Sequence, residues 1–412
     1  MSCYGYKRDT SPNIDSLSKE GIVFTQAVSQ GSVTITSLAS FLTGVYPVKH
    51  GIITQHLDYD KDFYYPTILE VLDKSGYSTA TFFAHPLLPI VQWTHRGVDY
   101  SYSTEYYCNN SDRININSDA ELTDSALDWI NKEHKKPFFV WMHYMAPHTP
   151  YLPPLPYDKL YVNDKYYDPH KTAGFVGNLE GRGGIPPDAA IGDISEVDYY
   201  IAQYDGEVRY TDEEIGRFIK KLKELKLYKN TLIIISADHG ESLGEHNVYF
   251  EHAAGLYDES IRIPLIIKLP QEKFRSKIVN RQVRAVDIMP FILDILHVKV
   301  PENIDGESLY SLITGRGVYK SRYSFSKTAV MNSIRTEEWK LIYYEDSNSY
   351  ELSNLKKDPQ ELTNLYDVEK KITQKLSSEM EEIASIPSDI KRGTEGIDKK
   401  AKEIMRSLGY VQ

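Results

Sequence analysis

Hydrophobic positions in the first 300 residues follow two alternating patterns. Apolar runs occur at 22–24, 138–142, 232–235 and, with one lysine, at 264–269, and runs of this kind are typical of strands buried on both faces. Residues 78–84, which mix Ser and Thr with Ala and Phe, are also predicted to form a buried strand. The segments between them have apolar residues at every third or fourth position, as expected for helices that cover a sheet. This alternation predicts an α/β fold.

Start and stop signals place the helices. Thr67, Ser118 and Thr211 each have a glutamate three residues later, which is the spacing of a capping box at a helix start. Gly44 has the position of a residue that ends a helix. The predicted helices begin near Ser11, Ser37, Thr67, Ser118, Thr211 and Val286.

Two regions depart from this pattern. Residues 151–194 have no clear period and many Pro, Gly, Tyr and Asp residues, so we expect a long functional loop. After about residue 300, short Lys- and Tyr-containing strands such as 339–343 precede a charged segment that we expect to be partly helical. We therefore predict a large α/β domain at 1–300 and a C-terminal subdomain at 301–412 with a small antiparallel sheet and a terminal helix.

Composition narrows the possible partners and location. Lys and Arg number 47 against 58 Asp and Glu, so the net charge is −11, which is unfavourable for binding nucleic acid. The two cysteines, Cys3 and Cys108, are too few for a disulfide framework or a four-cysteine zinc site. No apolar stretch is long enough for a membrane span, and no secretory leader follows Met1, so we expect a soluble, cytoplasmic protein.

The first candidate site follows the run 232–235. Ligands bind at the carboxyl ends of strands in open α/β sheets, so polar residues after apolar runs are of most interest. Asp238 and His239 precede Gly240 and are suited to holding a divalent cation. The alternative is a turn aspartate beside a surface histidine.

Further histidines lie in two other segments. His143 and His148 flank a Pro-rich turn, where one of them is suited to be a general acid or an anion contact. Glu245-His246 and Glu251-His252 are suited to a metal cage or phosphate contacts. Purely structural histidines and a solvated loop are the respective alternatives.

Hydroxyl side chains gather at the start of the helix predicted after Gly31. They include Thr34, and free amides at a helix N-terminus favour sulfate or phosphate groups there. A hydroxyl beside a metal becomes a stronger nucleophile because the cation stabilises the alkoxide. Ordinary helix capping is the alternative.

Together these segments resemble the sulfatase family of the alkaline phosphatase superfamily. The resemblance implies an alkaline-phosphatase-like sandwich, with a large mixed, mostly parallel sheet covered by helices and a smaller C-terminal antiparallel sheet. It covers nearly the whole chain in the right order. The matching segments are 10–17 with 21–24, 37–44 with 46–47, 146–151, 236–246, 256–259 with 262–265, 287–290, 351–355 with 358–361, and 407–410.

The resemblance also implies a reaction and a nucleophile. Sulfatases cleave esters through a covalent intermediate on a metal-bound formylglycine, made from Cys or Ser in a Cys/Ser-x-Pro-x-Arg motif. Counting back from Gly44, that position is Thr34, with Thr36 at the Pro position and Leu38 at the Arg position. Thr has no route to formylglycine by the usual modification, so Thr34 resembles the threonine-nucleophile branch, which includes phosphoethanolamine and phosphoglycerol transferases.

The remaining site residues come from the same resemblance. Asp238 and His239, with Thr34, are expected to bind a divalent metal ion (Ca, Mg, Mn or Zn). His148 is expected to contact the ester or its leaving group, and His252 lies near the position where sulfatases have a lysine. The expected substrate is a small-molecule or glycan sulfate or phosphate ester.

One family feature has no counterpart here. The family begins with an apolar central strand that ends in one or two metal-binding aspartates, just before the segment matched by 2–6. We therefore expect the natural chain to begin further upstream than Met1, and the sequence as given to bind metal weakly. The leading hypothesis is a metal-dependent hydrolase of sulfate or phosphate esters. The alternatives are a phosphoethanolamine- or phosphoglycerol-type transferase or phosphodiesterase, and a truncated non-catalytic pseudoenzyme.

Overall fold

The computed structural model describes residues 1–54, 63–104, 114–133, 135–320 and 322–388. Cys108, the segment 407–410 and the end of the charged C-terminal segment lie outside these residues. Among the described residues, no helix combines the length and the apolar character that crossing a membrane requires.

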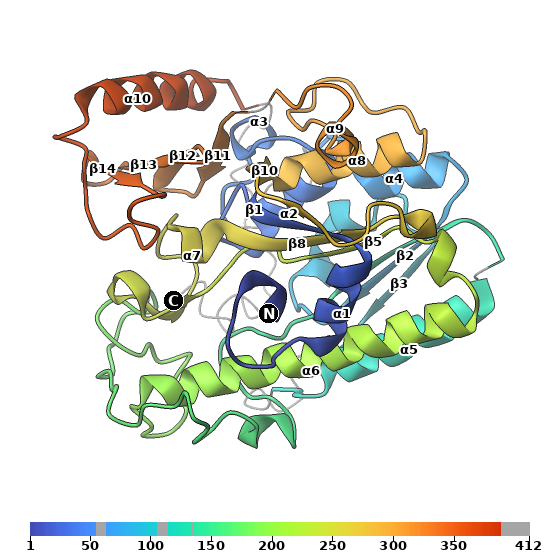
Figure 1. Cartoon of the computed structure of the whole chain (residues 1–412), viewed down its shortest axis with the longest axis horizontal. Coiled ribbons are helices and arrows are strands. Elements are labelled where there is room, and N and C mark those ends of the chain that lie inside the picture. Colours follow the sequence, from blue (N-terminus) through green and yellow to red (C-terminus); the bar gives the residue numbers. More distant parts are fainter. Residues whose placement is uncertain (55–62, 105–113, 134, 321, 389–412) are drawn as a thin grey trace.

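The centre of the molecule is built from two groups of strands (Figure 1). One is a mixed, five-stranded sheet in the order β10-β1-β8-β5, with β9 also paired to β1; the other is parallel, in the order β3-β2-β4. All five predicted strands form. The strands are β1 (Ile22–Val28), β2 (Ser78–Phe83), β3 (Tyr100–Ser103), β4 (Phe138–His143), β5 (Ile233–Ser236), β8 (Arg262–Lys268), β9 (Lys277–Val279) and β10 (Val283–Arg284).

The five-stranded sheet is not fully parallel because β8 is antiparallel to the strands beside it. Both its pairs, with β1 and with β5, are antiparallel, whereas β2 pairs in parallel with β3 and β4. A two-stranded hairpin of β6 (Ser242–Leu243) and β7 (Tyr249–Glu251) lies beyond β5. Mixed α/β architecture is thereby confirmed.

Helices cover the central strands, with α5 and α6 on one side and α4, α8 and α9 on the other (Figure 1). The predicted capping box of α4 is present, since Thr67 Oγ1 accepts from the Glu70 amide and Glu70 accepts from the Thr67 amide. The helices are α1 (Pro12–Glu20), α2 (Thr34–Thr43), α3 (Pro47–His50), α4 (Ile68–Lys74), α5 (Ser118–Glu133), α6 (Val197–Glu224), α7 (Asp258–Ile261), α8 (Ile288–Ile295), α9 (Tyr310–Thr314) and α10 (Lys370–Ala384).

The start of α6 was predicted wrongly: the helix begins at Val197, fourteen residues before Thr211. Gly206 has a low helix propensity, so it weakens the sequence pattern that predicts a helix here. The structure explains why a glycine is needed at this position. A Cβ at Gly206 would lie 2.6 Å from the carbonyl oxygen of Tyr157, so the loop before α6 packs directly on the helix backbone. The Thr211 hydroxyl donates to the carbonyl of Ala146 (3.0 Å) rather than capping a helix.

The C-terminal part is an antiparallel sheet with one helix on it, as predicted (Figure 1). Leu376 and Met380 of α10 pack in one buried cluster with Phe325, Ile334 and Leu341 of the sheet. The strands are β11 (Ser324–Lys327), β12 (Met331–Arg335), β13 (Trp339–Tyr344) and β14 (Ser349–Asn354). The division of the chain at residue 300 stays a prediction.

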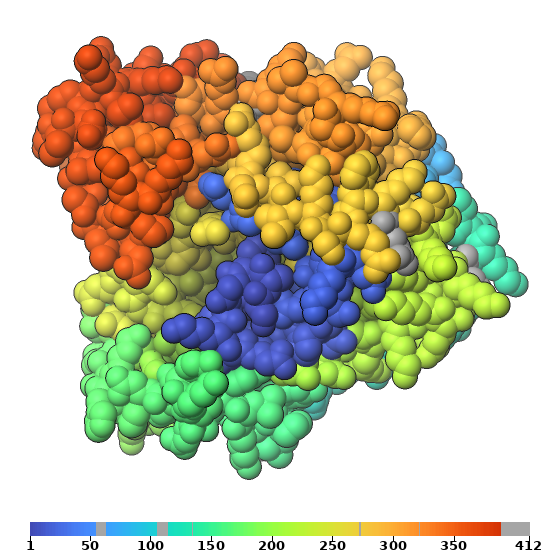
Figure 2. Space-filling model, in the orientation of Figure 1, coloured from blue at the N-terminus to red at the C-terminus, as the bar shows by residue number. Residues whose placement is uncertain are grey.

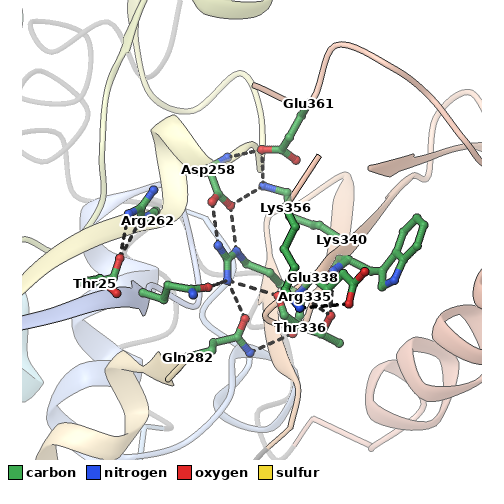
Figure 3. Close-up of polar contacts among 12 residues, drawn as sticks. Thr25, Asp258, Arg262, Gln282, Arg335, Thr336, Glu338, Lys340, Lys356 and Glu361 are labelled. Atoms are coloured by element: carbon green, nitrogen blue, oxygen red, sulfur yellow. Dashed lines mark hydrogen bonds and ion pairs between the residues drawn. The ribbon is translucent and has the colours of Figure 1, made fainter. Parts of the chain in front are cut away.

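A buried ion cluster ties α7 to this C-terminal sheet (Figure 3). Both carboxylate oxygens of Asp258 accept from the Arg335 guanidinium, at 2.9 and 2.8 Å. Lys340, which has no exposed surface, donates to Asp258 (2.9 Å) and to Glu361 (2.7 Å). Burial by itself raises the pKa of Asp258, but Lys340 and Arg335 lower it well below its ordinary value.

Candidate active site

The predicted site residues meet at the carboxyl ends of the central strands. His148 follows β4, Asp238 and His239 follow β5, and Thr34 is the first residue of the facing helix α2. His252 follows the hairpin strand β7. Segments more than 200 residues apart in the sequence therefore contribute to one site, in the place where open α/β sheets bind ligands.

Thr34 and His239 are in direct contact. The Thr34 Oγ1 and His239 Nε2 atoms lie 3.3 Å apart, and Thr34 is almost fully buried. His239 Nδ1 lies 2.9 Å from the carbonyl oxygen of Gly240, which can only accept, so Nδ1 carries the proton. Burial lowers the pKa of His239 to about 4, so the ring is neutral near pH 7. Nε2 is then an acceptor, and the Thr34 hydroxyl donates to it.

His252 differs from the other histidines of the site because it is charged. Burial disfavours its protonated form, but the carboxylates of Glu251 and Glu241 raise its pKa to about 9. Its Nδ1 lies 3.6 Å from Glu241 and 3.7 Å from Glu251. The ring stacks on His239 with centroids 4.2 Å apart, so it brings a buried positive charge beside the Thr34–His239 pair.

His148 contributes a third imidazole ring, which contacts the ring of His252. Its ring meets His252 edge-on, with centroids 5.4 Å apart, and its Nδ1 lies 2.7 Å from the Thr149 carbonyl oxygen. Burial, and then the charge of His252, lower the pKa of His148 to about 3. His148 is therefore neutral with its proton on Nδ1, which leaves Nε2 as an acceptor.

Glu207 of α6 holds the segment that carries His148. Its two carboxylate oxygens accept from the backbone amides of His148 (3.1 Å) and Leu152 (2.8 Å). The side chain is buried, so both bonds form away from water. Nothing in the sequence pattern singles out Glu207, because the helix turn that carries it was not predicted.

Replacing Glu207 by glutamine is expected to lower the free energy of unfolding by about 1–3 kcal/mol, because the amide nitrogen would face a backbone N–H and leave it unpaired. Movement of His148 should also lower kcat roughly tenfold or more. Urea unfolding and steady-state kinetics measure the two effects. Glu213→Gln, at an exposed position of the same helix, is the matched control and should change neither. Unchanged stability in both variants would contradict a role for Glu207 in holding the segment.

Asp238 and His239 are suited to bind a cation, but they make up only part of a set of metal ligands. Asp238 Oδ2 is buried and makes no hydrogen bond within the part of the chain described. Burial raises the pKa of Asp238, but His239, His143 and His85 lower it below its ordinary value, so the carboxylate is ionised. Carboxylate oxygen and imidazole nitrogen are metal donors. No cluster of three or more His, Cys, Asp or Glu side chains suited to a metal ion occurs among the described residues.

His85 is a site residue that the sequence interpretation missed. It directly follows the segment 78–84, which was predicted as a strand and contains β2, so the rule that identified Asp238 would have identified it too. Its ring lies 5.8 Å from that of His143 and 6.5 Å from that of His148. Its Nδ1 accepts from the Leu87 amide (3.2 Å), and its buried Nε2 has no partner among the described residues.

His246 takes part in a different arrangement. Its Nδ1 lies 2.6 Å from Glu259, and its ring stacks on Tyr257 at 3.6 Å. Its Nε2 faces the carbonyl oxygen of Glu361, 3.4 Å away. His246 thus contacts α7 and the C-terminal part, whereas His252 contacts His239 and His148.

The contact between His246 and Glu259 makes a pH-dependent contribution to the free energy of unfolding. Burial lowers the pKa of His246, but the hydrogen bond to Glu259 outweighs it and raises the pKa above 6.5. The stabilisation by protonated His246 is therefore fully present below about pH 6.5, the pKa of the unfolded chain. It is lost as the pH rises through the higher pKa that His246 has in the folded protein. We expect the stability difference between the native chain and His246→Gln to be larger at pH 6 than at pH 9. Urea unfolding at both pH values measures it, and an equal difference at both would contradict the assignment.

Comparison with protein families gives two matches. Residues 1–298 match the sulfatase family model, and residues 244–385 match the model of the N-sulphoglucosamine sulphohydrolase C-terminal region. Two similar curated proteins are the ulvan-active sulfatase of Formosa agariphila (26% identity over 92% of this chain and 80% of that protein) and the N-acetylglucosamine-6-O-sulfatase of Bacteroides thetaiotaomicron (24% over 89% and 80%).

Solved structures with the same fold include a phosphonate monoester hydrolase of Silicibacter pomeroyi. It has a TM-score of 0.77 and 21% identity, over 97% of this chain and 95% of that one. Another was solved with its substrate D-glucosamine-2-N,6-O-disulfate, with a TM-score of 0.74 and 22% identity, over 93% and 94%. At these identities the likeness confirms the fold.

Proposed function

The chain belongs to the sulfatase family, and on this premise we propose that it hydrolyses a sulfate or phosphate ester with Thr34 as the nucleophile. The observation that carries the proposal is the contact of Thr34 Oγ1 with His239 Nε2 beside the charged His252. A buried hydroxyl with an aligned acceptor and a nearby positive charge is suited to attack on an anionic ester.

The proposed reaction has two steps. Thr34 Oγ1 gives its proton to His239 Nε2 and forms a bond to the sulfur or phosphorus atom while the bond from that atom to the ester oxygen breaks, and the alcohol leaves with that proton. Water then attacks the same sulfur or phosphorus atom, which restores the Thr34 hydroxyl and releases inorganic sulfate or phosphate. Attack of an alcohol instead of water would make the enzyme a transferase.

Each neighbouring residue has a proposed role. His239 Nε2 orients the Thr34 hydroxyl, and the His252 imidazolium balances the negative charge of the ester. His148 Nε2, as an acceptor, is proposed to take a hydrogen bond from the departing alcohol. Asp238 and His239 would hold a divalent cation, which when bound would act as a Lewis acid and would occupy the His239 Nε2 lone pair that otherwise accepts from Thr34.

A phosphate diester is the second candidate substrate. Thr34 is an ordinary hydroxyl, and in the family's sulfate chemistry the nucleophile is instead a formylglycine. A plain alkoxide suits phosphorus, where a phospho-threonine can be resolved by water or by an alcohol. This favours a phosphodiesterase or a phosphoethanolamine- or phosphoglycerol-type transferase as the alternative.

We propose a sulfated or phosphorylated sugar as the substrate class, since the relatives named above are an ulvan-active sulfatase and an N-acetylglucosamine-6-O-sulfatase. The long loop before α6 supplies a group near the site. Burial and the charge of Glu251 raise the pKa of Asp188 in this loop to about 6, and Asp188 also interacts electrostatically with His252. Variation of this loop is then expected to change which alcohol is accepted.

A substrate panel tests the proposal. The purified protein is assayed on an aryl sulfate and on an aryl phosphate diester, each with added Ca, Mg, Mn or Zn. Turnover of the sulfate supports the leading assignment, and turnover of the diester alone supports the alternative. If both esters bind but neither is turned over with any of these metals, both the leading assignment and the alternative are overturned. The protein would then be a non-catalytic binding protein.

A further inference from the structure

Two buried carboxylate oxygens near His252 have no hydrogen-bond partner. They are Glu241 Oε1 and Asp188 Oδ1, and neither atom forms a hydrogen bond within the part of the chain that the structure describes. The Glu241 side chain is only 5% exposed, so it is shielded from bulk solvent. Buried polar atoms are paired in most proteins, so these two oxygens indicate a donor that the chain itself does not supply.

The hairpin of β6 and β7 places two glutamates around His252. Glu241 directly precedes Ser242, which pairs with Glu251 across the hairpin. The His252 Nδ1 atom lies 3.6 Å from Glu241 and 3.7 Å from Glu251. Glu251 is already engaged, since its Oε1 accepts from the backbone amides of His252 (2.9 Å) and Ala253 (3.0 Å). Glu241 is therefore the glutamate that has an oxygen left for a ligand.

The long loop before α6 brings Asp188 to the same place. Its neighbour Ala189 packs in one buried cluster with Phe250, which directly precedes Glu251. Asp188 itself is half-buried, and Oδ1 is an atom of it that is turned away from solvent. Figure 2 shows the loop, in green, beside the hairpin segment, in yellow-green, at the left of this face. Asp188 thus connects the surface of the molecule with the two glutamates.

The three carboxylates of Glu241, Glu251 and Asp188 outnumber the cations beside them. Among the described residues, no lysine or arginine forms an ion pair with any of the three, and His252 is their cation. Burial raises the pKa of Glu241, His252 lowers it, and Glu251 and Asp188 raise it further. A second positive charge among these carboxylates would relieve their mutual repulsion.

An ammonium group fits this position better than a metal ion. No set of three or more His, Cys, Asp or Glu side chains suited to a metal ion occurs in the described part of the chain. An ammonium group instead brings one positive charge and N–H donors, which are what two unpaired carboxylate oxygens need.

We propose that Glu241 and Asp188 bind a primary ammonium group on the alcohol part of the substrate. The inference rests on the proposed function, since the ester would be held at Thr34 on the other side of His252. The His252 ring stacks on His239, which contacts Thr34, while its Nδ1 faces the carboxylates. The substrate would therefore have its amine only a few bonds from the ester oxygen. Esters of amino sugars and of ethanolamine both have this chemistry.

Binding of matched pairs of esters tests the inference. One pair is glucosamine 6-sulfate with glucose 6-sulfate, and the other is 2-aminoethyl phosphate with ethyl phosphate. Calorimetry uses the full chain with Thr34→Ala, so that no ester is consumed. We expect the amine-bearing member of at least one pair to bind about tenfold more tightly or better than its partner. The pair that shows this preference distinguishes an amino sugar from an ethanolamine ester.

Two variants locate the preference for the amine. Asp188→Asn and Glu241→Gln each remove one negative charge, so each should remove most of the preference and change the binding of the amine-free esters little. Asp193→Asn, at an exposed position of the same loop, is the matched control and should keep the full preference. A preference that survives both Asp188→Asn and Glu241→Gln would overturn the inference, as would equal binding of the two members in both pairs.

Free glucosamine and glucose separate this inference from the proposed hydrolysis. If none of the four esters binds but glucosamine binds more tightly than glucose, the ammonium site stands and the ester function fails. If no ester binds and glucosamine and glucose bind equally, the ammonium site is overturned as well. A preference for the amine-bearing esters without turnover by the native chain would contradict the proposed hydrolysis alone.

Discussion

Replacing Thr34 by alanine is expected to lower kcat about 1000-fold or more on whichever ester the protein hydrolyses. The reason is that the hydroxyl in contact with His239 Nε2 is the proposed attacking atom, and removal of a nucleophile abolishes the covalent route. Thr34→Ser keeps a hydroxyl at the same place and should retain most of the turnover. Steady-state kinetics of the native chain and both variants measure the effect.

Thr43→Ala is the matched control for this experiment. Thr43 is a buried threonine at the other end of the same helix, where its hydroxyl donates to the Ala39 carbonyl. It should leave kcat nearly unchanged. If Thr34→Ala kept kcat within about tenfold of the native chain while remaining folded, Thr34 would not be the nucleophile.

Replacing Asp258 by asparagine is expected to lower the free energy of unfolding by about 3–5 kcal/mol. Asparagine removes the charge opposite Arg335 and Lys340, and buried cations without a counter-charge are strongly destabilising (Figure 3). Glu361 would remain as the single carboxylate for Lys340. Thermal and urea unfolding of the two proteins measure the loss, which is large relative to the stability of a typical domain.

Lys356→Gln is the control for the ion cluster. Lys356 pairs with Glu338 at 3.2 Å on the surface, where 62% of its side chain is exposed. Exposed pairs contribute little, so this variant should unfold like the native chain. Equal stability of the Asp258→Asn variant and the control would show that the buried cluster does not hold α7 to the C-terminal sheet.

The central strands were predictable because apolar runs have a direct physical cause: a strand covered on both faces needs an apolar side chain at nearly every position. The start of α6 was not, because Gly206 and its neighbours are adapted to the loop that packs on them and not to helix formation. His85 illustrates a different limit. Its signal was present at the end of a predicted strand, but its importance depends on the rings of His143 and His148, which come from β4 and from the segment after it.

The sequence by itself determined the α/β architecture, the antiparallel C-terminal sheet and the family, because each of these depends on local patterns and on the order of motifs. Only the tertiary structure decided how the site residues differ chemically. His239 and His148 are neutral and His252 is charged because of burial and of the carboxylates that the fold places beside each ring. The strand order likewise emerges only in the folded chain, since pairing between strands joins residues that are distant in the sequence.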